Sequence, residues 1–392
     1  MSVRKSLNLL LPALLGLSIV ACSSTPDLAP ASPLPDVGNT LNTKARWSTS
    51  IGKGVGEYYS QLKPVVEGDR VFAASRDGVL AAYDKETGKR QWQLRLDKLA
   101  INEQQRSPRI AGGLVAAYGN LYFGSENGLV YAVSQADGEL LWTQTVAGEV
   151  LAAPAVDDGK VVVHTSAGNL IALDSSSGVQ QWQLRNEQPS LTLRSQATPV
   201  TAGGAVLYGR ADGRLGIALL ANGQPVRDTR IANPRGATEL ERMVDVAAKP
   251  VILGDILFTI AYNGQLTAHQ LISGQELWKR QYQGSQDLST DGRLLYISDS
   301  RSHLFAVDAR SGMEVWSNTE LENRQLTASV VFGDYLVAGD AQGYLYWFDS
   351  QTGVLKSLQR IDSKGLYVAP IVAGNTLYVQ SRSGDLLAID QP

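Results

Sequence analysis

A short phrase of apolar positions between turn-forming residues recurs along the whole chain. Its first complete copy, DGVLAAYDKETGKRQW over residues 77–92, places an apolar run at 79–83 between two turns that contain glycine. An apolar and partly aromatic run of this length is typical of a strand, and Gly88 can supply the positive φ of a tight hairpin. The phrase therefore predicts a strand, a turn and a returning strand that carries Trp92.

The phrase returns at a regular spacing. Its second glycine stands at Gly88, Gly138, Gly178, Gly223, Gly274, Gly312 and Gly353. A period of about 40–50 residues is the range of four-stranded propeller blades. An earlier half of each repeat adds two strands, the first often opened by proline, as a strand with a free backbone side allows. These prolines are Pro64, Pro154, Pro199, Pro250 and Pro370, and three repeats lack one, near Ala111, Ser289 and Ser329.

We therefore predict an all-β fold, an eight-bladed β-propeller of four-stranded antiparallel blades. The last repeat ends at Asp390 without an outer strand, whereas residues 45–50, ARWSTS, precede the first repeat as an unmatched strand. We expect this N-terminal strand to pair with the last blade, because closure removes two exposed sheet edges. Trp47 would then take the place of the missing tryptophan.

The regularly spaced tryptophans are interpreted as packing residues between blades rather than as a ligand platform. They are Trp92, Trp142, Trp182, Trp278 and Trp316. Each such side chain buries roughly 150–250 Å². One copy has Arg227 at the tryptophan position, and Trp347 lies off it, so we expect Trp347 to pack within its own blade.

The N-terminus reads as a targeting segment, which is kept apart from the fold. Residues 1–21 form a signal peptide with a basic start and an apolar run too short to span a bilayer. The run ends in IVAC, which resembles the lipobox of bacterial lipoproteins, so Cys22 is expected to be lipidated and palmitoylated. By the same resemblance, Ser23 directs the protein to the outer membrane. Residues 22–44 are predicted to be a flexible tether and residues 45–392 the propeller.

Composition changes the picture little. With 35 basic and 38 acidic residues the net charge is -3, which is not the basic footprint of a nucleic-acid partner. His164, His269 and His303 fall in separate repeats, without the spacing of metal ligands. The adjacent Asp157 and Asp158 read as a turn, and no nucleophile elbow, P-loop or zinc-protease motif is present. We expect no metal, no cofactor and no catalytic site.

Three connections are longer than the propeller requires: residues 96–109, 183–196 and 228–246. All three join an outer strand to the inner strand of the next blade, so they should emerge on one face, and the last two flank the same blade. Leu191 and Leu193, beside Arg194 and near Asp245, are expected to form a protein-binding patch. The alternative is that both leucines pack beneath their own loop.

The repeat resembles that of pyrroloquinoline-quinone dehydrogenases, and this resemblance implies a catalytic function as one possibility. Those enzymes are longer and carry a calcium site, a catalytic carboxylate and often a disulfide, whereas the only cysteine here is Cys22. We favour a protein that is not an enzyme. The alternative is a quinoprotein-like dehydrogenase or a ligand-binding periplasmic propeller.

Nearly the whole chain resembles the BamB family of outer-membrane assembly lipoproteins. The resemblance is carried by the lipobox and by SPLP (32–35), WSTS (47–50), PSLTLR (189–194), NGQLTA (263–268) and GYLYW (343–347). It implies a scaffold of the Bam complex on the periplasmic face of the outer membrane. This scaffold would bind the POTRA domains of BamA and assist insertion of β-barrel proteins, with unfolded outer-membrane proteins as a further partner to consider.

The resemblance also assigns the contacts with BamA to Leu191, Leu193, Arg194 and Asp245. One departure weakens the assigned polar contact. The family pattern has a second aspartate two residues after the first, and this chain has Ala247 there.

Overall fold

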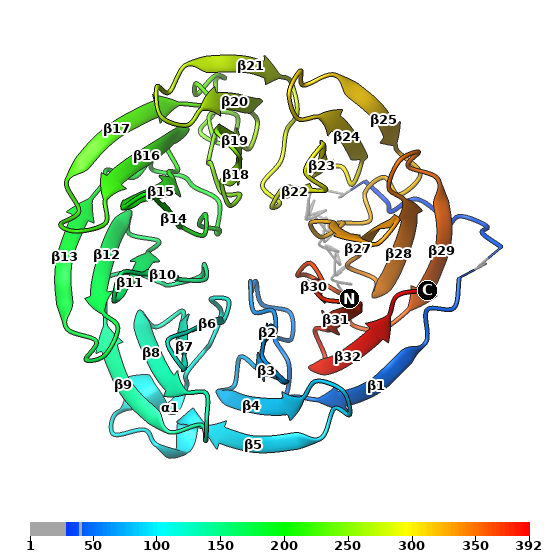
Figure 1. The fold of residues 1–392 in the computed structure, drawn as a ribbon. Helices are drawn as coiled ribbons and strands as arrows, with labels where there is room; N and C mark the ends of the chain where they lie inside the picture. The colour runs from blue at the N-terminus through cyan, green and yellow to red at the C-terminus, as the bar shows by residue number, and fades with distance from the viewer. Residues whose placement is uncertain (1–28, 39–40) are drawn as a thin grey trace, which may run out of the picture. The chain divides into compact units, whose positions relative to one another are not determined.

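The computed structural model describes residues 29–38 and 41–392, and its propeller unit comprises Ala31–Pro392. Its strands form eight antiparallel sheets of four strands, arranged as blades around a central axis (Figure 1). The predicted all-β, eight-bladed propeller is therefore confirmed. The predicted signal peptide and Cys22 lie outside the described residues.

Each blade has four strand positions, counted from the axis outward. The innermost strands are β2 (Val65–Glu67), β6 (Val115–Ala117), β10 (Ala155–Asp157), β14 (Val200–Ala202), β18 (Val251–Leu253), β22 (Ser289–Thr290), β26 (Val330–Phe332) and β30 (Ile371–Ala373). The second strands are β3 (Arg70–Ala74), β7 (Asn120–Gly124), β11 (Lys160–His164), β15 (Ala205–Gly209), β19 (Ile256–Ile260), β23 (Leu294–Ser298), β27 (Tyr335–Gly339) and β31 (Thr376–Gln380).

The third strands are β4 (Val79–Asp84), β8 (Leu129–Ser134), β12 (Asn169–Asp174), β16 (Arg214–Leu219), β20 (Leu266–Gln270), β24 (Leu304–Asp308), β28 (Tyr344–Asp349) and β32 (Asp385–Asp390). The outer strands are β5 (Arg90–Arg95), β9 (Leu140–Thr145), β13 (Gln180–Arg185), β17 (Pro225–Arg230), β21 (Glu276–Arg280), β25 (Glu314–Asn318), β29 (Leu355–Arg360) and β1 (Ala45–Ser50). We number the blades one to eight from β2–β5 to β30–β32 with β1.

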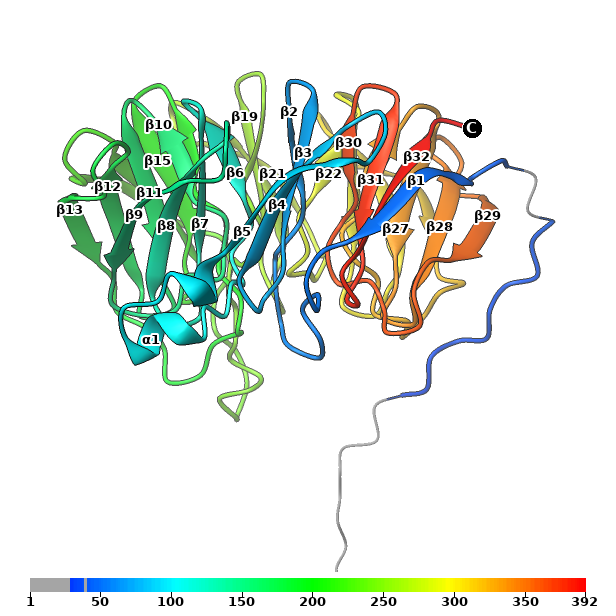
Figure 2. The same cartoon turned by 90° about the horizontal axis from the view of Figure 1, so that it is seen from below.

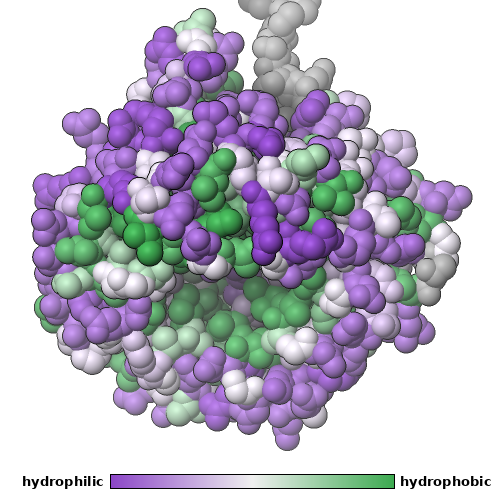
Figure 3. All heavy atoms as spheres, turned by 45° about the horizontal axis from the view of Figure 1, so that its top comes forward, coloured by the Kyte–Doolittle hydropathy of each residue, from purple (hydrophilic) through white to green (hydrophobic). Residues whose placement is uncertain are grey.

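The burial of each strand follows from its place in the blade. Second and third strands such as β3 and β4 are buried along nearly their whole length, because neighbouring blades cover both of their faces. Outer strands such as β21 bury only the residue that faces the next blade and expose the rest. Hydrophobic residues also line the hollow at the centre of the ring, while hydrophilic residues cover much of the rim (Figure 3).

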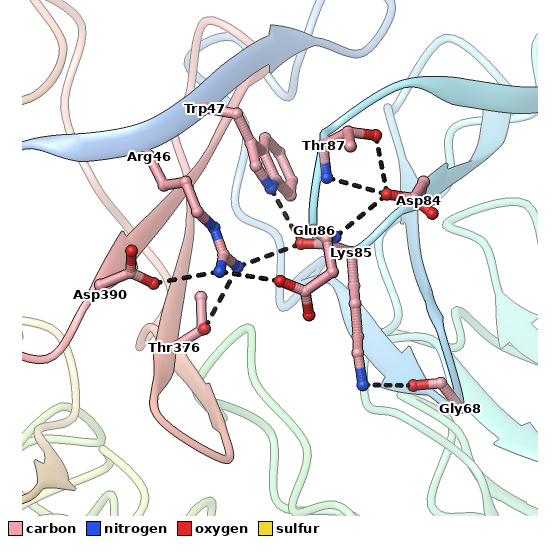
Figure 4. A network of polar contacts seen from close by, with 9 residues as sticks. All are labelled: Arg46, Trp47, Gly68, Asp84, Lys85, Glu86, Thr87, Thr376 and Asp390. Atoms are coloured by element: carbon pink, nitrogen blue, oxygen red, sulfur yellow. Dashed lines mark hydrogen bonds and ion pairs between the residues drawn. The ribbon is translucent and has the colours of Figure 1, made fainter.

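The ring is closed by the N-terminal strand, as predicted. Strand β1 pairs antiparallel with β32, and Trp47 lies opposite Ala388. The Trp47 indole donates to the carbonyl of Lys85 in blade one at 2.9 Å (Figure 4). Arg46 adds an ion pair to Glu86 at 2.9 Å and one to Asp390 at 3.4 Å, so the two ends of the chain meet in one polar network.

The tryptophans couple neighbouring blades in the way expected from their spacing. In each case the indole N–H donates to a backbone carbonyl in the next blade, as Trp92 does to Gln135 at 3.0 Å and Trp316 to Ser350 at 3.0 Å. The ring lies on the hairpin glycine of that blade, such as Gly138 beneath Trp92. Arg227 replaces the tryptophan between blades four and five, and its guanidinium donates to the carbonyl of Ile272 at 2.8 Å.

Blade seven departs from this scheme for a structural reason. Ser357 occupies the tryptophan position, and the buried Trp347 lies opposite it on the neighbouring strand, where the blades that have a tryptophan at this position carry alanine. Blade eight has no hairpin between its third and outer strands, because its outer strand is β1. A tryptophan at position 357 would therefore have no hairpin glycine to cover. Trp347 packs inside the core between blades seven and eight.

The two faces of the ring differ. One face, which we call the hairpin face, carries the turns between first and second strands and between third and outer strands. The other, the long-loop face, carries the connections between blades and includes the short helices η1 (Leu96–Lys98) and α1 (Glu103–Arg106) (Figure 2). All three long connections emerge on this second face, as the sequence predicts.

The segment predicted to be a flexible tether is not free along its whole length. Ser32 is hydrogen-bonded to the connection between blades six and seven, and Thr43 to Gln359 of β29 at 2.6 Å. Val37 and Leu41 pack against two of the hydrophobic clusters between blades. The described part of the predicted tether from residue 31 onward is therefore attached to the propeller.

Candidate functional site

The second long connection precedes blade four and the third follows it, and the two contact each other. The backbone amide of Leu193 donates to Oδ1 of Asp245 at 2.9 Å, and the hydroxyl of Ser190 donates to Glu239 at 2.9 Å. The structure thus brings Asp245 next to the loop that carries Leu191, Leu193 and Arg194, as the sequence predicts. We call residues 189–196 the candidate loop.

Asp245 does not lie on the surface. Its residue is only 2% exposed, and it accepts the Leu193 amide from beneath the candidate loop. Burial raises the pKa of its carboxyl to about 6, because the low-dielectric surroundings disfavour the charged form. The structure therefore gives Asp245 the geometry of a residue that positions the loop, where the sequence had suggested a surface contact.

A small pocket of about 20 Å³ lies beside Asp245. It is lined by His164, Thr165, Gln196 and the buried Ala247. Oδ2 of Asp245 and Oε1 of Gln196 are buried there and have no hydrogen-bond partner among the described residues. Ala247, at the position where the sequence resemblance led us to expect aspartate, thus faces this interior pocket rather than solvent.

Arg194 belongs to a ladder of charges that crosses three blades. Its guanidinium lies 2.9 Å from Glu149 and 3.7 Å from Glu126, and Glu126 pairs with Arg76 of blade one at 2.7 Å. The hydrogen bond from Arg194 to Glu149 raises the pKa of the guanidinium. The Arg194 side chain is still 45% exposed, so it is oriented by the ladder and remains accessible to a partner.

Two residues that the sequence gave no reason to select also hold the candidate loop. From the connection between β1 and β2, Tyr59 donates its hydroxyl to Ser195 at 2.8 Å, and Gln61 donates to the carbonyl of Gln196 at 3.3 Å. Burial raises the pKa of Tyr59, which keeps its hydroxyl a donor. These contacts bridge 136 and 135 positions of sequence between irregular segments, where no periodic pattern operates.

The two leucines differ in accessibility. Leu191 is 41% exposed, and Leu193 is half-buried beside Asp245. Leu193 and Arg194 border a depression of about 440 Å³ at the centre of the long-loop face, together with Tyr59, Gln61 and Tyr367. The alternative that both leucines pack beneath their own loop is therefore not what the structure shows for Leu191.

The remaining residues considered for chemistry are dispersed. His164, His269 and His303 are buried in blades three, five and six, and Asp158 occupies the hairpin turn after β10. Within residues 29–38 and 41–392, no group of three or more His, Cys, Asp or Glu side chains is placed to hold a metal ion. Over the same part of the chain, no helix has both the length and the apolar character needed to span a bilayer.

Comparisons with known proteins agree on one family. A family model described as outer membrane protein assembly factor BamB matches residues 39–117 and 98–318. The chain is 40% identical to the outer membrane protein assembly factor BamB of Yersinia pestis, with 99% of each chain covered. The crystal structure of BamB from Moraxella catarrhalis superposes with a TM-score of 0.80 at 25% identity, covering 89% of this chain and 100% of that one.

A europium-containing methanol dehydrogenase also shares the architecture. Its TM-score is 0.73 with 90% of this chain and 95% of that chain covered, but the identity is 13%, so the likeness shows the propeller fold alone. The family model and the near full-length relative are more specific than the shared architecture. On these grounds the chain belongs to the BamB family of outer-membrane protein assembly factors.

Proposed function

We propose that this protein is a non-catalytic scaffold lipoprotein of the Bam complex that docks on the POTRA domains of BamA. Leu191, Leu193 and Arg194 would make the contact, and the bound protein would assist insertion of β-barrel proteins into the outer membrane. Residues 1–21 would be removed as a signal peptide, and a lipid on Cys22 would hold the propeller at the periplasmic face. The family assignment supports this proposal.

The observation that carries the proposed docking site is the way in which the candidate loop is held. Asp245 from one neighbouring connection, Glu149 from another and Tyr59 from the connection between β1 and β2 all restrain residues 193–195. A loop already fixed in one conformation loses little entropy when a partner binds. An exposed leucine and a partly exposed arginine on such a support have the composition of a protein-binding hot spot.

Asp245 enters this proposal as a positioning residue. Its buried carboxylate cannot reach a partner without displacement of the candidate loop, whereas its hydrogen bond fixes the backbone of Leu193. Ala247 is buried as well, so a missing aspartate at that position removes no surface charge. The contact surface of this chain is then the loop itself.

Binding to the purified POTRA domains of BamA tests the proposal. We expect Leu193→Ala and Arg194→Glu each to weaken binding by about 2 kcal/mol or more, roughly thirtyfold, if they are hot spots. Leu277→Ala is the matched control, because Leu277 is an exposed leucine on the outer strand β21. Unchanged affinity in both loop variants would reject the candidate loop as the docking site.

The absence of catalysis is proposed from the family to which the chain belongs. The shared architecture with a methanol dehydrogenase carries no activity with it, because one fold hosts many functions. Substrate handling is a separate matter: a soluble form lacking Cys22 can be tested for binding to an unfolded outer-membrane protein in the absence of BamA. Binding there would add the unfolded chain as a second partner.

A further inference from the structure

The described residues 31–38 and 41–44 of the N-terminal segment lie along the flank of blade seven, between one face of the ring and the other. Its C-terminal end continues into β1, whose first residue pairs with Ile389 near the hairpin face. At its other end, Ser32 contacts Glu322 in the connection between blades six and seven, on the long-loop face. We call the described residues 31–38 and 41–44 the strap.

The strongest attachment of the strap is at Ser32. Its amide donates to the carbonyl of Glu322 at 2.9 Å, and its hydroxyl donates to the carbonyl of Glu320 at 2.9 Å. Its own carbonyl accepts a bond from Arg324 at 2.8 Å. The donor, acceptor and hydroxyl of one residue are thus all bonded to a single connection between blades.

Buried side chains of blade seven hold Arg324 in position for this contact. It is buried, and its guanidinium is held by Asp340 at 2.8 Å, by Tyr346 at 2.7 Å and by Gln342 at 2.6 Å. A buried charge requires such complete pairing. One guanidinium N–H is directed to the carbonyl of Ser32, so the propeller side of this contact is held by buried partners.

Further contacts hold the strap along its length. Val37 packs on the cluster between blades six and seven, and Leu41 on the cluster between blades seven and eight. Thr43, which is buried, donates to Gln359 of β29. The strap therefore lies across the seam where blade eight has no hairpin of its own to cover blade seven.

We propose that the strap fixes the departure point of the N-terminal segment on the long-loop face, and so turns that face toward the membrane that holds the anchor. This inference rests on the proposed lipid at Cys22. From Cys22 to Ala31 an extended chain reaches at most about 30 Å, whereas a chain free up to Ala45 would reach about 80 Å. The attached strap thus shortens the free chain between the lipid and the propeller and makes it leave from one face only. The candidate loop lies on that membrane-facing side.

The orientation can be measured on the full lipidated protein bound to vesicles of phosphatidylethanolamine and phosphatidylglycerol. Cys22 is the only cysteine and its thiol would be blocked by lipid, so a single added cysteine can be labelled selectively. Ala167→Cys places the dye in an exposed turn of the long-loop face, and Asp255→Cys in an exposed turn of the hairpin face. We expect stronger energy transfer to a headgroup acceptor from position 167 than from position 255.

The strap itself is tested by Ser32→Pro, which removes the amide and hydroxyl donors to Glu322 and Glu320. The same variant carries Val37→Ser and Leu41→Ser, which remove the two apolar contacts, and Thr43→Val, which removes the bond to Gln359. We expect the difference in transfer between the two positions to fall by at least half. A control with Asp36→Gly and Asn42→Gly changes exposed residues of the same segment and should preserve the difference. Circular dichroism establishes that the propeller remains folded in each variant.

The outcomes separate the two proposals. Equal transfer from both positions, the reverse order, or an unchanged difference in the strap variant would overturn the role of the strap while leaving the anchor intact. Failure of the unaltered protein to bind vesicles would refute the lipid anchor and, with it, the orienting role. Binding to soluble POTRA domains involves no membrane and is unaffected by either result.

Discussion

The carboxylate of Asp245 accepts a hydrogen bond from the backbone amide of Leu193 at 2.9 Å, across the base of blade four. This contact joins two connections that are 52 positions apart in sequence and fixes the backbone of the candidate loop from its buried side. We therefore expect the charge at position 245 to act on the loop rather than on a partner.

Two substitutions at this position distinguish positioning from direct contact. Asp245→Ala removes the acceptor and leaves the Leu193 amide unpaired, so we expect a loss of about 1–3 kcal/mol in the free energy of unfolding. Binding to POTRA domains should weaken by about tenfold or more as the loop loosens, which corresponds to about 1.4 kcal/mol. Asp245→Asn keeps an acceptor oxygen and should largely retain binding. Equal losses in the two variants would instead mean that the negative charge meets the partner.

The raised pKa of Asp245 predicts a pH dependence. Between about pH 4 and pH 6 the carboxyl ionises in the unfolded chain while the folded protein retains the proton, so the free energy of unfolding falls as pH rises through this window. A difference of about two pKa units corresponds to at most about 3 kcal/mol. His164 and Arg210 line the same pocket, and both are present in the natural protein and in the Asp245→Asn variant with which it is compared.

Denaturation of the natural protein and of Asp245→Asn across pH 4–8 checks this expectation. The natural protein should lose stability relative to the variant as pH rises to about 6, and the difference should then level off. A constant difference over the whole range would show that Asp245 titrates normally in the folded state.

Arg227 offers a test of how neighbouring blades are coupled. Its guanidinium covers the hairpin glycine of blade five and donates to Ile272, the role that an indole plays between most other blades. We expect Arg227→Ala to lower the free energy of unfolding by about 0.5–1.5 kcal/mol, since one hydrogen bond between the blades and the cover over Gly274 are lost. Arg227→Trp should be tolerated. Arg235→Ala, at an exposed position, is the control, and an equal effect of both alanine variants in thermal unfolding would count against this role.

Ring closure can be probed without removing any side chain. A methyl group added at Gly88 would lie 2.6 Å from the ring of Trp47, whereas one added at Gly68 would meet nothing within 4 Å. Both glycines have positive φ, +68° and +59°, so both alanine variants carry a similar backbone penalty. We expect Gly88→Ala to be less stable than Gly68→Ala by about 1–3 kcal/mol, the cost of overpacking. Matching denaturation midpoints would argue that the Trp47 contact contributes little to closure.

The periodic parts of this fold could be predicted from sequence because each repeat carries its own signal. Gly88 marks a hairpin that local backbone geometry requires, and the unmatched Trp47 has meaning only as the missing member of a regular series. A single repeat cannot bury its own apolar surface and must pack against neighbouring repeats. The number of blades and the closure of the ring could therefore be predicted by counting the repeats.

The irregular contacts could not be predicted in the same way. The burial of Asp245 depends on how two insertions fold over each other, and no spacing within either insertion indicates it. Ser32 lies in a segment rich in proline whose composition suggests a free tether, yet it is bonded through backbone groups that any residue would supply. The exchange of roles between Ser357 and Trp347 becomes intelligible only when blade eight is seen to lack a hairpin.

The pairing of β1 with β32 has a consequence for the folding of the newly synthesised chain. Arg46 and Thr376, which meet at the closing seam, are 330 positions apart, and synthesis produces the first of them long before the second. Contacts between such distant partners form slowly, because a large loop must close before they contribute. A polypeptide interrupted before its final strand would keep two adhesive edges open. The ring can therefore close only after synthesis is complete. We expect truncated products to remain open rings and to be degraded.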